Sequence, residues 1–333
     1  MRVDQLPTPA LVVDTTALDA NLAAMTAALP GPRLRPHVKA HKCTALARRQ
    51  ADAGHRTFTC ATPREMEGMA RAGLGDDLLL ANEVVDDERL SRLAALDARV
   101  TVAVDSDATI DAAARNGIRE VLVDVNVGLP RCGCDPGDAG RLADRARSRG
   151  LAVRGVMGYE GHVVGVEDRA ARVEQTAVCM DLLVKAHADT GGEVISAGGT
   201  GTYDINTWAN EIQAGSYALM DGAYDKLELP FRPALWVNAT VISMSPGWAV
   251  ADCGLKALGM DHGNPTVTGG TVWYCSDEHV TFSADAGDGS VRVGDRVQVW
   301  PAHIDPTIAY HERMHLAQGD EVVDTWEVDL RGW

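Results

Sequence analysis

Short apolar segments alternate with helical, alanine- and arginine-rich segments between about residues 33 and 217. Eight segments have the length and apolar content of buried strands. They are residues 33–39, 56–61, 77–81, 99–104, 120–127, 153–159, 193–198 and 211–215. Between most of them, apolar residues recur at helical spacing. Two of these helical segments, PREMEGMARAG and DAGRLADRARSRG, end in glycine, a usual helix stop.

This alternation indicates the fold class. Strands that alternate with helices predict a parallel α/β sheet with right-handed crossovers. Eight such units favour closure into a (β/α)8 barrel, the TIM barrel. A doubly wound sheet is the second interpretation, but the first strand ends at Lys39 and not in the glycine-rich turn of a dinucleotide-binding fold.

The pattern changes after about residue 235, where short strands are separated by glycine, aspartate and proline. This composition predicts a compact, β-rich C-terminal domain. The N-terminal TPALVVDTTAL predicts one more strand, followed by a helix from about Thr16, and we expect the strand to join that domain. The predicted domains are a barrel over 16–232 and a β domain built from 1–15 and 233–333.

Composition narrows the classes of partner. The chain has 333 residues, 46% of them hydrophobic, which is enough for a barrel core and a second domain. The net charge is −16 and no Lys/Arg run occurs, so we expect neither a nucleic-acid nor a membrane partner. There is no signal-peptide pattern and no membrane-spanning apolar run, and seven scattered cysteines suggest reduced thiols. We therefore expect a cytoplasmic protein.

In a barrel, active residues lie where strands end at the carboxyl side. That rule selects Lys39 after the first strand, Arg131 after the fifth, and Tyr159 and His162 after the sixth. Glycine-rich segments, AGGTG (197–201) and AGSY (214–217), follow the seventh and eighth strands and are typical of phosphate-binding loops. A lysine facing a phosphate loop indicates pyridoxal phosphate, which a lysine holds as a Schiff base. Taken singly, each feature has an ordinary structural explanation; together, in this strand order, they favour the cofactor.

The segment RPHVKAHK (35–42) resembles the Arg-Pro-His-x-Lys-x-His-Lys signature of the D-threonine aldolase and D-serine dehydratase family. Its members are fold-type III pyridoxal-phosphate enzymes related to the alanine racemase barrel. The resemblance continues over most of the chain, in TPALVVD (8–14), CATPREMEGMARAG (60–73), DDLLLANEVV (76–85), VDVNVGLPRCG (123–133) and PAHIDPT (301–307).

The resemblance assigns roles to particular residues. It implies that Lys39 is the Schiff-base lysine, that Arg131 hydrogen-bonds the cofactor and that Tyr159 lines its pocket. Lys42 matches the second lysine of the signature, and we expect it at the start of the following helix. The residues implied to hold the phosphate are Thr200, Gly201, Gly215, Ser216 and Tyr217.

Two overlapping metal-binding patterns occur in PAHIDPTIAYHERMH (301–315). His311, Glu312 and His315 form H-E-x-x-H, which binds zinc only on a helix. Pro306 lies just upstream, and two strands joined by a Gly-Asp turn are predicted downstream, so we do not expect a helix or a zinc peptidase here.

The second pattern is the H-x-D of His303 and Asp305. At a strand or its end, residues i and i+2 point to the same side, about 6.5 Å apart, and can reach one ion. On local sequence alone the two side chains would simply pair with each other. The family resemblance makes them a metal pair, suited to Mn²⁺, Mg²⁺, Co²⁺ or Zn²⁺.

Asp305 also bears on the reaction, because the dehydratases of the family typically have H-x-C where the aldolases have H-x-D. The resemblance implies a metal-dependent aldolase that cleaves D-β-hydroxy-α-amino acids such as D-threonine to glycine and an aldehyde. His162 is our candidate base, since imidazole titrates near neutral pH; the alternative is a histidine that only hydrogen-bonds locally. His279 is a second candidate pocket residue.

Other functions remain open. One is a D-serine or D-threo-3-hydroxyaspartate dehydratase, an ammonia-lyase of the same family. Another is a non-catalytic pyridoxal-phosphate-binding protein. A strict racemase is less expected, because it needs no metal at a β-hydroxyl. The alanine racemase relatives are dimers, so we expect a homodimer.

Overall fold

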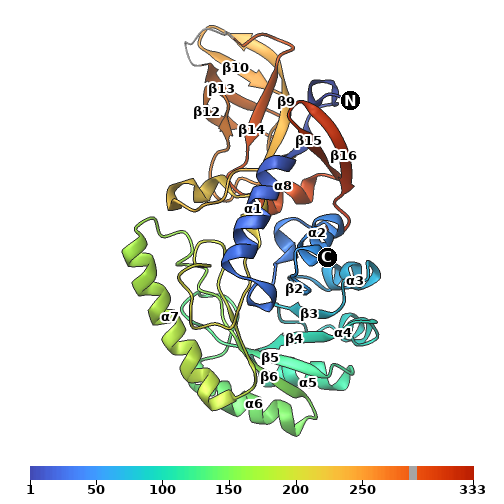
Figure 1. Cartoon of the computed structure of the whole chain (residues 1–333), viewed down its shortest axis with the longest axis vertical. Coiled ribbons are helices and arrows are strands. Elements are labelled where there is room, and N and C mark those ends of the chain that lie inside the picture. The colour runs from blue at the N-terminus through green and yellow to red at the C-terminus, as the bar shows by residue number, and fades with distance from the viewer. Residues whose placement is uncertain (285–290) are drawn as a thin grey trace. The chain divides into compact units, whose positions relative to one another are not determined.

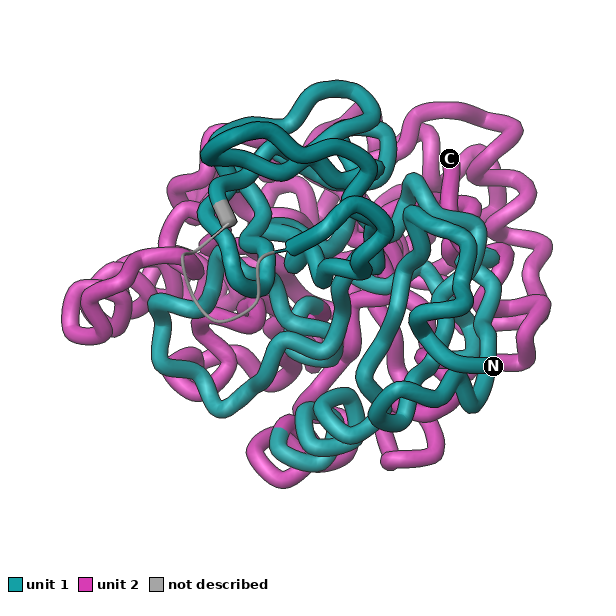
Figure 2. Tube along the Cα trace, turned by 90° about the horizontal axis from the view of Figure 1, so that it is seen from above, with its two compact units in different colours: residues 1–24, 40–45, 216–329 teal, residues 25–39, 46–215, 330–333 magenta. Residues whose placement is uncertain are grey.

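The computed structural model describes residues 1–284 and 291–333. The chain divides into two compact units, coloured separately in Figure 2. The barrel unit contains residues 25–39, 46–215 and 330–333, and the β unit contains residues 1–24, 40–45 and 216–329. Compactness alone defines these units, and the predicted domain boundaries at 15/16 and 232/233 stay a prediction.

The barrel unit is built on a parallel sheet in which seven strands pair in chain order, β2 to β8. They are β2 (Thr57–Cys60), β3 (Asp77–Leu80), β4 (Val100–Val104), β5 (Glu120–Asp124), β6 (Ala152–Met157), β7 (Val194–Ala197) and β8 (Glu211–Ile212). Helices alternate with these strands, as Figure 1 shows. They are α2 (Thr44–Asp52), α3 (Pro63–Arg71), α4 (Asp87–Ala94), α5 (Asp107–Arg115), α6 (Ala139–Ser148) and α7 (Arg169–Thr190).

The segment that precedes Lys39 closes the sheet into the predicted eight-membered barrel. Leu34 forms a parallel bridge with Ile212 of β8, and His37 forms one with Thr59 of β2. The segment makes isolated bridges and no regular strand, because Pro36 has no N–H to donate. The Pro36 carbonyl still accepts a hydrogen bond from the Thr59 N–H at 3.0 Å. Seven of the eight predicted strands are therefore confirmed as β2 to β8, while the first, residues 33–39, forms only isolated bridges. Because these bridges close the sheet, the doubly wound alternative is wrong.

Local capping explains where several helices begin. Thr62 caps α3, and its hydroxyl accepts a hydrogen bond from the Glu65 N–H while the Glu65 side chain returns to the Thr62 N–H. Ser106 caps α5 in the same reciprocal way with Thr109. Asp86 caps α4 through the N–H of Arg89. These side chains satisfy the first backbone donors of each helix and fix the loop that enters it.

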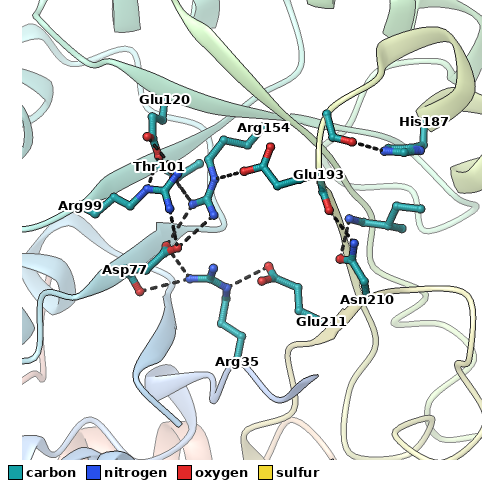
Figure 3. A network of polar contacts seen from close by, with 12 residues as sticks. Arg35, Asp77, Arg99, Thr101, Glu120, Arg154, His187, Glu193, Asn210 and Glu211 are labelled. Atoms are coloured by element: carbon teal, nitrogen blue, oxygen red, sulfur yellow. Dashed lines mark hydrogen bonds and ion pairs between the residues drawn. The ribbon is translucent and has the colours of Figure 1, made fainter. Parts of the chain in front are cut away.

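A buried ionic network lies at the amino ends of the barrel strands (Figure 3). Asp77, the first residue of β3, is bonded by Arg35 at 3.0 Å and by Arg154 at 3.0 and 3.1 Å. Arg35 also reaches Glu211, the first residue of β8, at 2.9 Å, and Arg154 reaches the Thr101 hydroxyl at 2.8 Å. Arg35 thus ties the closing segment to strands on both of its sides.

The β unit contains a nine-stranded sheet, and β9 also pairs with β10. This extra pairing closes β10, β13, β12, β11, β14 and β9 into an antiparallel barrel, from which β1, β15 and β16 extend. The strands are β1 (Ala10–Asp14), β9 (Leu235–Ser245), β10 (Trp248–Ala251), β11 (Thr266–Val267), β12 (Gly270–Cys275), β13 (Val280–Ala284), β14 (Arg296–Trp300), β15 (Arg313–Gln318) and β16 (Glu321–Glu327).

The N-terminal strand belongs to this sheet, as predicted. β1 pairs antiparallel with β9 and parallel with β15, and its residues Leu11, Val12 and Val13 are almost fully buried. Helix α1 (Thr15–Ala28) follows it directly, and α8 (Ile304–Tyr310) lies between β14 and β15. Short 3-10 turns occur at Val3–Gln5, Gly31–Arg33, Val38–Ala40, Pro136–Asp138, Ser216–Ala218 and Gly222–Leu227.

Two further observations bear on the expectations of membrane and redox chemistry. Over residues 1–284 and 291–333, none of the helices combines the length and apolar character needed to cross a bilayer. All seven cysteines lie in this part of the chain and are free thiols.

Candidate active site

Three loops of the barrel unit meet beyond the carboxyl ends of β5, β6 and β7. The Arg131 guanidinium carbon lies 5.4 Å from the centre of the Tyr159 ring, within cation–π range. A Cβ atom on Gly199 would lie 3.4 Å from that ring, so the loop after β7 also packs on Tyr159. The structure therefore brings together Arg131, Tyr159 and the glycine-rich segment, which the sequence places far apart.

His162 belongs to the same group of loops. A Cβ atom on Gly128, in the loop that carries Arg131, would lie 3.0 Å from its imidazole ring. The His162 Nε2 atom is 3.8 Å from the Cys179 sulfur on α7. Burial raises the pKa of the Cys179 thiol to about 11, with a smaller contribution from Glu160, so the sulfur beside the imidazole stays protonated at neutral pH.

The loop after β7 is held in shape by Glu160, a fully buried carboxylate that sequence reasoning missed. Its oxygens accept hydrogen bonds from the Gly198 N–H at 3.2 Å and the Thr202 hydroxyl at 2.8 Å. Within the loop, a Cβ atom on Gly201 would lie 1.8 Å from the Val164 carbonyl oxygen, so only glycine fits there. Thr200 and Gly201 thus lie in a tightly fixed turn whose backbone suits an anion.

Carboxyl groups gather beside Arg131. Burial raises the pKa of the Asp124 carboxyl well above its ordinary value, and the charge and hydrogen bond of Glu83 raise it further, while Arg131 acts in the opposite direction. The hydrogen bond to Glu83 is the main reason that the pKa of the Cys132 thiol rises to about 12. Burial and the Glu83 charge therefore favour the protonated form of the Asp124 carboxyl, beside the Arg131 guanidinium.

Lys39 lies in the 3-10 turn Val38–Ala40, directly after the segment that closes the barrel. The His37 N–H donates to the Ala214 carbonyl at 3.1 Å, so Gly215 follows beside the end of this segment. Lys39 is half-buried. Since the strands are parallel, its end of the barrel is the end that carries Arg131, Tyr159 and the Gly201 loop.

Ser216 and Tyr217 form a 3-10 turn in the β unit with Ala218. Tyr217 is 1% exposed, and its ring packs 5.7 Å from that of Phe231. The Ser216 hydroxyl donates to Asp221, a carboxylate that is 2% exposed and that sequence reasoning also missed. The other bond to Asp221 comes from the Ile304 N–H, at 2.6 Å, so one buried carboxylate connects the Ser216 turn to the start of α8.

His303 and Asp305 occupy the start of α8, where His303 is the N-cap residue and Asp305 lies in the first turn. The expectation that they stand at a strand end is therefore wrong, because β14 finishes earlier, at Trp300. His303 and Asp305 nevertheless lie close to the buried carboxyl of Asp221. Burial raises the pKa of Asp221, and the neighbouring Asp305 charge raises it further, while the Ile304 N–H and His303 lower it.

Lys42 lies two residues before α2 and not at its first residue. Its backbone φ is +50°, in the left-handed region that side-chain-bearing residues rarely adopt. Its ammonium group donates to the Asp305 carbonyl at 2.9 Å. The second lysine of the signature therefore reaches the H-x-D motif within the β unit.

We predicted that the H-E-x-x-H pattern would not lie on a helix, and this is confirmed. Helix α8 ends at Tyr310, and His311 caps it with an imidazole that contacts the Ala257 carbonyl at 3.0 Å. Burial lowers the pKa of His311, which holds the ring neutral. His315 lies in β15 and contacts the Thr325 hydroxyl at 3.1 Å. Contrary to expectation, Pro306 does not exclude a helix, because proline is tolerated in the first turn of a helix and α8 contains it there.

Two further residues surround His303. Asp261 lies 2.7 Å from its Nδ1 atom, and the His262 ring stacks on its ring. Neither was singled out from the sequence, where they form only an Asp-His pair in a loop rich in glycine and proline. His279, the second candidate pocket residue, lies in the turn between β12 and β13, where its carbonyl accepts the Ser276 N–H at 2.8 Å.

The donor sets fit both groups that the resemblance implies. A half-buried lysine, an arginine, an aromatic ring and a glycine loop that excludes side chains suit a pyridine ring with a phosphate. An imidazole with one or two buried carboxylates suits a divalent ion.

Comparisons with known proteins agree with this arrangement. Residues 13–221 match the family model "Alanine racemase, N-terminal domain", and residues 234–317 match "Putative serine dehydratase domain". The chain is 34% identical over 362 residues to a D-threonine aldolase of Arthrobacter sp., covering 100% of this chain and 94% of that protein. It is 33% identical over 366 residues to a 3-hydroxy-D-aspartate aldolase of Paracoccus denitrificans, with the same coverage.

Solved structures extend the likeness to three dimensions. The crystal structure of D-threonine aldolase from Filomicrobium marinum superimposes with a TM-score of 0.94 at 33% identity, covering 100% of this chain and 98% of that one. D-threo-3-hydroxyaspartate dehydratase from Delftia sp. gives a TM-score of 0.88 at 26% identity, with 100% of both chains covered. The sequence signature, the barrel and these full-length similarities show that the chain belongs to the D-threonine aldolase and D-serine dehydratase family, which shares the alanine racemase fold.

Proposed function

We propose that this chain is a pyridoxal-phosphate-dependent, metal-dependent aldolase that cleaves the Cα–Cβ bond of D-β-hydroxy-α-amino acids. D-threonine would give glycine and acetaldehyde. The observation that carries the proposal is the meeting of Arg131, Tyr159 and the Gly201 loop at the barrel end where Lys39 lies. Similarity along the whole chain to two aldolases supports the choice of reaction.

Lys39, Arg131, Tyr159 and the glycine-rich segments would bind the cofactor. Lys39 would hold it covalently, Arg131 would hydrogen-bond its ring, and Tyr159 would pack against it. The phosphate would be held by Thr200, Gly201, Gly215, Ser216 and Tyr217. When bound, pyridoxal phosphate supplies an electron sink for the electron pair left on Cα. The carboxyl groups of Asp124 and Glu83, beside Arg131, would help to keep its guanidinium in place.

His303 and Asp305 of the β unit would hold the divalent ion, which lowers the pKa of a hydroxyl bound to it. Asp305 in the H-x-D motif favours an aldolase, since the dehydratases of the family typically have cysteine there. The His162 imidazole would take the proton from the β-hydroxyl oxygen. Because the Cys179 sulfur stays protonated, no neighbouring thiolate competes with the imidazole for that proton.

A dehydratase is the second candidate, because the Delftia enzyme covers the whole chain with a TM-score of 0.88. That reaction would eliminate the β-hydroxyl as water, and hydrolysis of the resulting imine would release ammonia and leave a 2-oxo acid. The products therefore separate the two candidates directly.

The test is product identification with purified protein, D-threonine and Mn²⁺, with and without EDTA. Glycine and acetaldehyde that disappear with EDTA support the proposal, whereas 2-oxobutyrate and ammonia refute it in favour of the dehydratase. Lys39→Ala should lose the visible absorbance of the bound cofactor. The matched control is Lys185→Ala, since Lys185 is 71% exposed on α7 and should leave the absorbance unchanged. Retained cofactor without turnover of any D-β-hydroxy amino acid would identify a non-catalytic carrier.

We also propose a homodimer, from the resemblance to alanine racemases. Light scattering on the purified protein should give twice the 35.4 kDa mass of the chain. A mass of one chain at micromolar concentration would contradict the dimer.

A further inference from the structure

His303 is held on two sides by residues from one loop of the β unit. Its Nδ1 atom lies 2.7 Å from an Asp261 carboxylate oxygen. The His262 ring lies parallel to the His303 ring, with an angle of 6° between planes and 3.9 Å between centres. The His303 side chain is only 16% exposed, whereas those of Asp261 and His262 are 56% and 44% exposed. His303 is therefore the least exposed of the three side chains, and Asp261 and His262 both contact it.

The loop that carries Asp261 and His262 is anchored to the start of α8. Gly259 forms an antiparallel bridge with His303, and its N–H donates to the Thr307 hydroxyl at 2.9 Å. That hydroxyl donates in turn to the His303 carbonyl at 2.8 Å. A Cβ atom on Gly259 would lie 2.1 Å from Pro306, so the loop can approach this closely only with glycine. Backbone contacts thus fix where Asp261 and His262 stand.

These three side chains look at first like a metal site of their own, because potential ligand atoms of Asp261, His262 and His303 lie within 4.8 Å of one another. The stacking argues against it. An imidazole lone pair lies in the plane of its ring, and the metal must lie about 2.1 Å away in that plane. Parallel, stacked rings direct their lone pairs along separate planes, so the two nitrogens do not converge on one ion.

The same geometry leaves one nitrogen of His303 for a metal. A carboxylate at 2.7 Å accepts a hydrogen bond from Nδ1–H, which makes Nδ1 the protonated nitrogen and leaves the Nε2 lone pair open to a ligand. Carboxylates commonly hold metal-binding histidines in this way. We propose that Asp261 and His262 are positioning residues, which fix the tautomer and the ring plane of His303 so that Nε2 binds the divalent ion. The binding of an ion at His303 rests on the proposed function, whereas the tautomer of His303 rests only on its contact with Asp261.

The first experiment measures Mn²⁺ binding to the purified full chain by the electron paramagnetic resonance of free Mn²⁺. Asp261→Ala should raise the Kd about 10- to 100-fold, as loss of such a partner does elsewhere. Asp261→Asn keeps an acceptor oxygen and should raise it less. Asp277→Asn is the matched control, because Asp277 is an exposed loop aspartate of the same unit, and it should leave the Kd unchanged. An Asp261→Ala protein with the wild-type Kd would overturn the proposal.

The second experiment separates stacking from ligation at His262. Phenylalanine keeps a flat ring but has no nitrogen, so His262→Phe should bind Mn²⁺ nearly as the wild type does. His262→Ala loses the stacking and should raise the Kd about two- to tenfold. If His262→Phe abolishes binding as fully as His303→Ala does, His262 is a ligand and the stacking role is wrong.

The third experiment reads the tautomer without any metal. Two-bond proton–nitrogen spectra of the histidine rings, with His303→Ala to assign the signal, should show His303 protonated at Nδ1 only. Asp261→Ala should remove that preference. If the wild type binds no Mn²⁺ yet shows this tautomer, the metal-dependent function fails while the role of Asp261 stands. A His303 protonated at Nε2 in the wild type would refute the positioning role whatever the activity.

Discussion

Replacing Asp77 by asparagine tests the buried ionic network of the barrel (Figure 3). The side chains of Arg35 and Arg154 are 2% and 9% exposed, so neither guanidinium can turn to water when its partner loses its charge. Asparagine keeps the shape of Asp77 but offers one acceptor oxygen, and its amide group would face two cations. The variant therefore removes the negative charge of Asp77 with little change in side-chain size.

Removing one partner from a buried ion pair costs roughly 3–5 kcal/mol, because the other charge is left uncompensated. Glu211 still bonds Arg35, and Glu193 still bonds Arg154 at 3.1 Å, so the lower end of this range applies. We expect the free energy of unfolding to fall by about 3 kcal/mol, which is more than a hundredfold in the folding equilibrium.

The pH dependence gives a second, independent reading of the same interaction. Burial raises the pKa of Asp77, but Arg35 and Arg154 more than offset this, and the folded-state pKa is lowered. A lowered pKa contributes stability that is present above the unfolded-state value, about 3.9, and is lost as the pH falls through the folded-state value. The difference between the wild type and Asp77→Asn should therefore be full at pH 7 and shrink below about pH 4.

The assay is urea unfolding followed by circular dichroism at a series of pH values. Asp76→Asn is the matched control, since Asp76 precedes Asp77 and pairs with Arg56 at 3.3 Å, with side chains 58% and 74% exposed. An exposed pair of this kind contributes less than about 1 kcal/mol. If the two variants lose equal stability at pH 7, or if the Asp77→Asn loss is the same at all pH values, the buried network does not act as described.

Three other substitutions test the site. Gly201→Ala would place a methyl group 1.8 Å from the Val164 carbonyl, so the displaced loop should raise the cofactor Kd in an absorbance titration about tenfold; an unchanged Kd would remove this loop from the phosphate site. Glu160→Gln would replace one of the two carboxylate oxygens, which accept from the Gly198 N–H and the Thr202 hydroxyl, by an amide nitrogen. The donor left unsatisfied should lower the stability by roughly 1–3 kcal/mol in thermal unfolding and also weaken cofactor binding. A melting temperature equal to that of the wild type would contradict this. Glu312→Gln changes an exposed residue outside the site, so aldolase turnover should stay within about twofold; an inactive protein would return attention to H-E-x-x-H.

The barrel could be predicted from the sequence because its strands are short, apolar and separated by amphipathic helices. The segment 33–39, which closes the barrel, was predicted for the same reason, although with Pro36 it forms isolated bridges and no regular strand. Lys39, Arg131, Tyr159 and the two glycine loops could be placed because parallel strands carry their active residues at one end.

Other features of the site had no local pattern to reveal them. Glu160 and Asp221 are single acidic residues, and only folding shows that they are buried and bonded to loops distant in sequence. The start of α8 was missed because proline in a first helical turn resembles a helix breaker. Asp261 and His262 depend on a tertiary contact with a residue some forty positions later, which no periodicity encodes.

The position of β1 has a consequence for how the protein is made. Leu11 pairs with Val237 and Met314, so β1 cannot complete its pairing until these much later residues have been synthesised. At 5–20 residues per second this delay is roughly 10–60 s. All the strands of the parallel sheet have been made by Ile212. The β unit, in contrast, must form after Met314 has been synthesised, and until then Leu11, Val12 and Val13 form an exposed apolar segment that a chaperone or another nascent chain can bind.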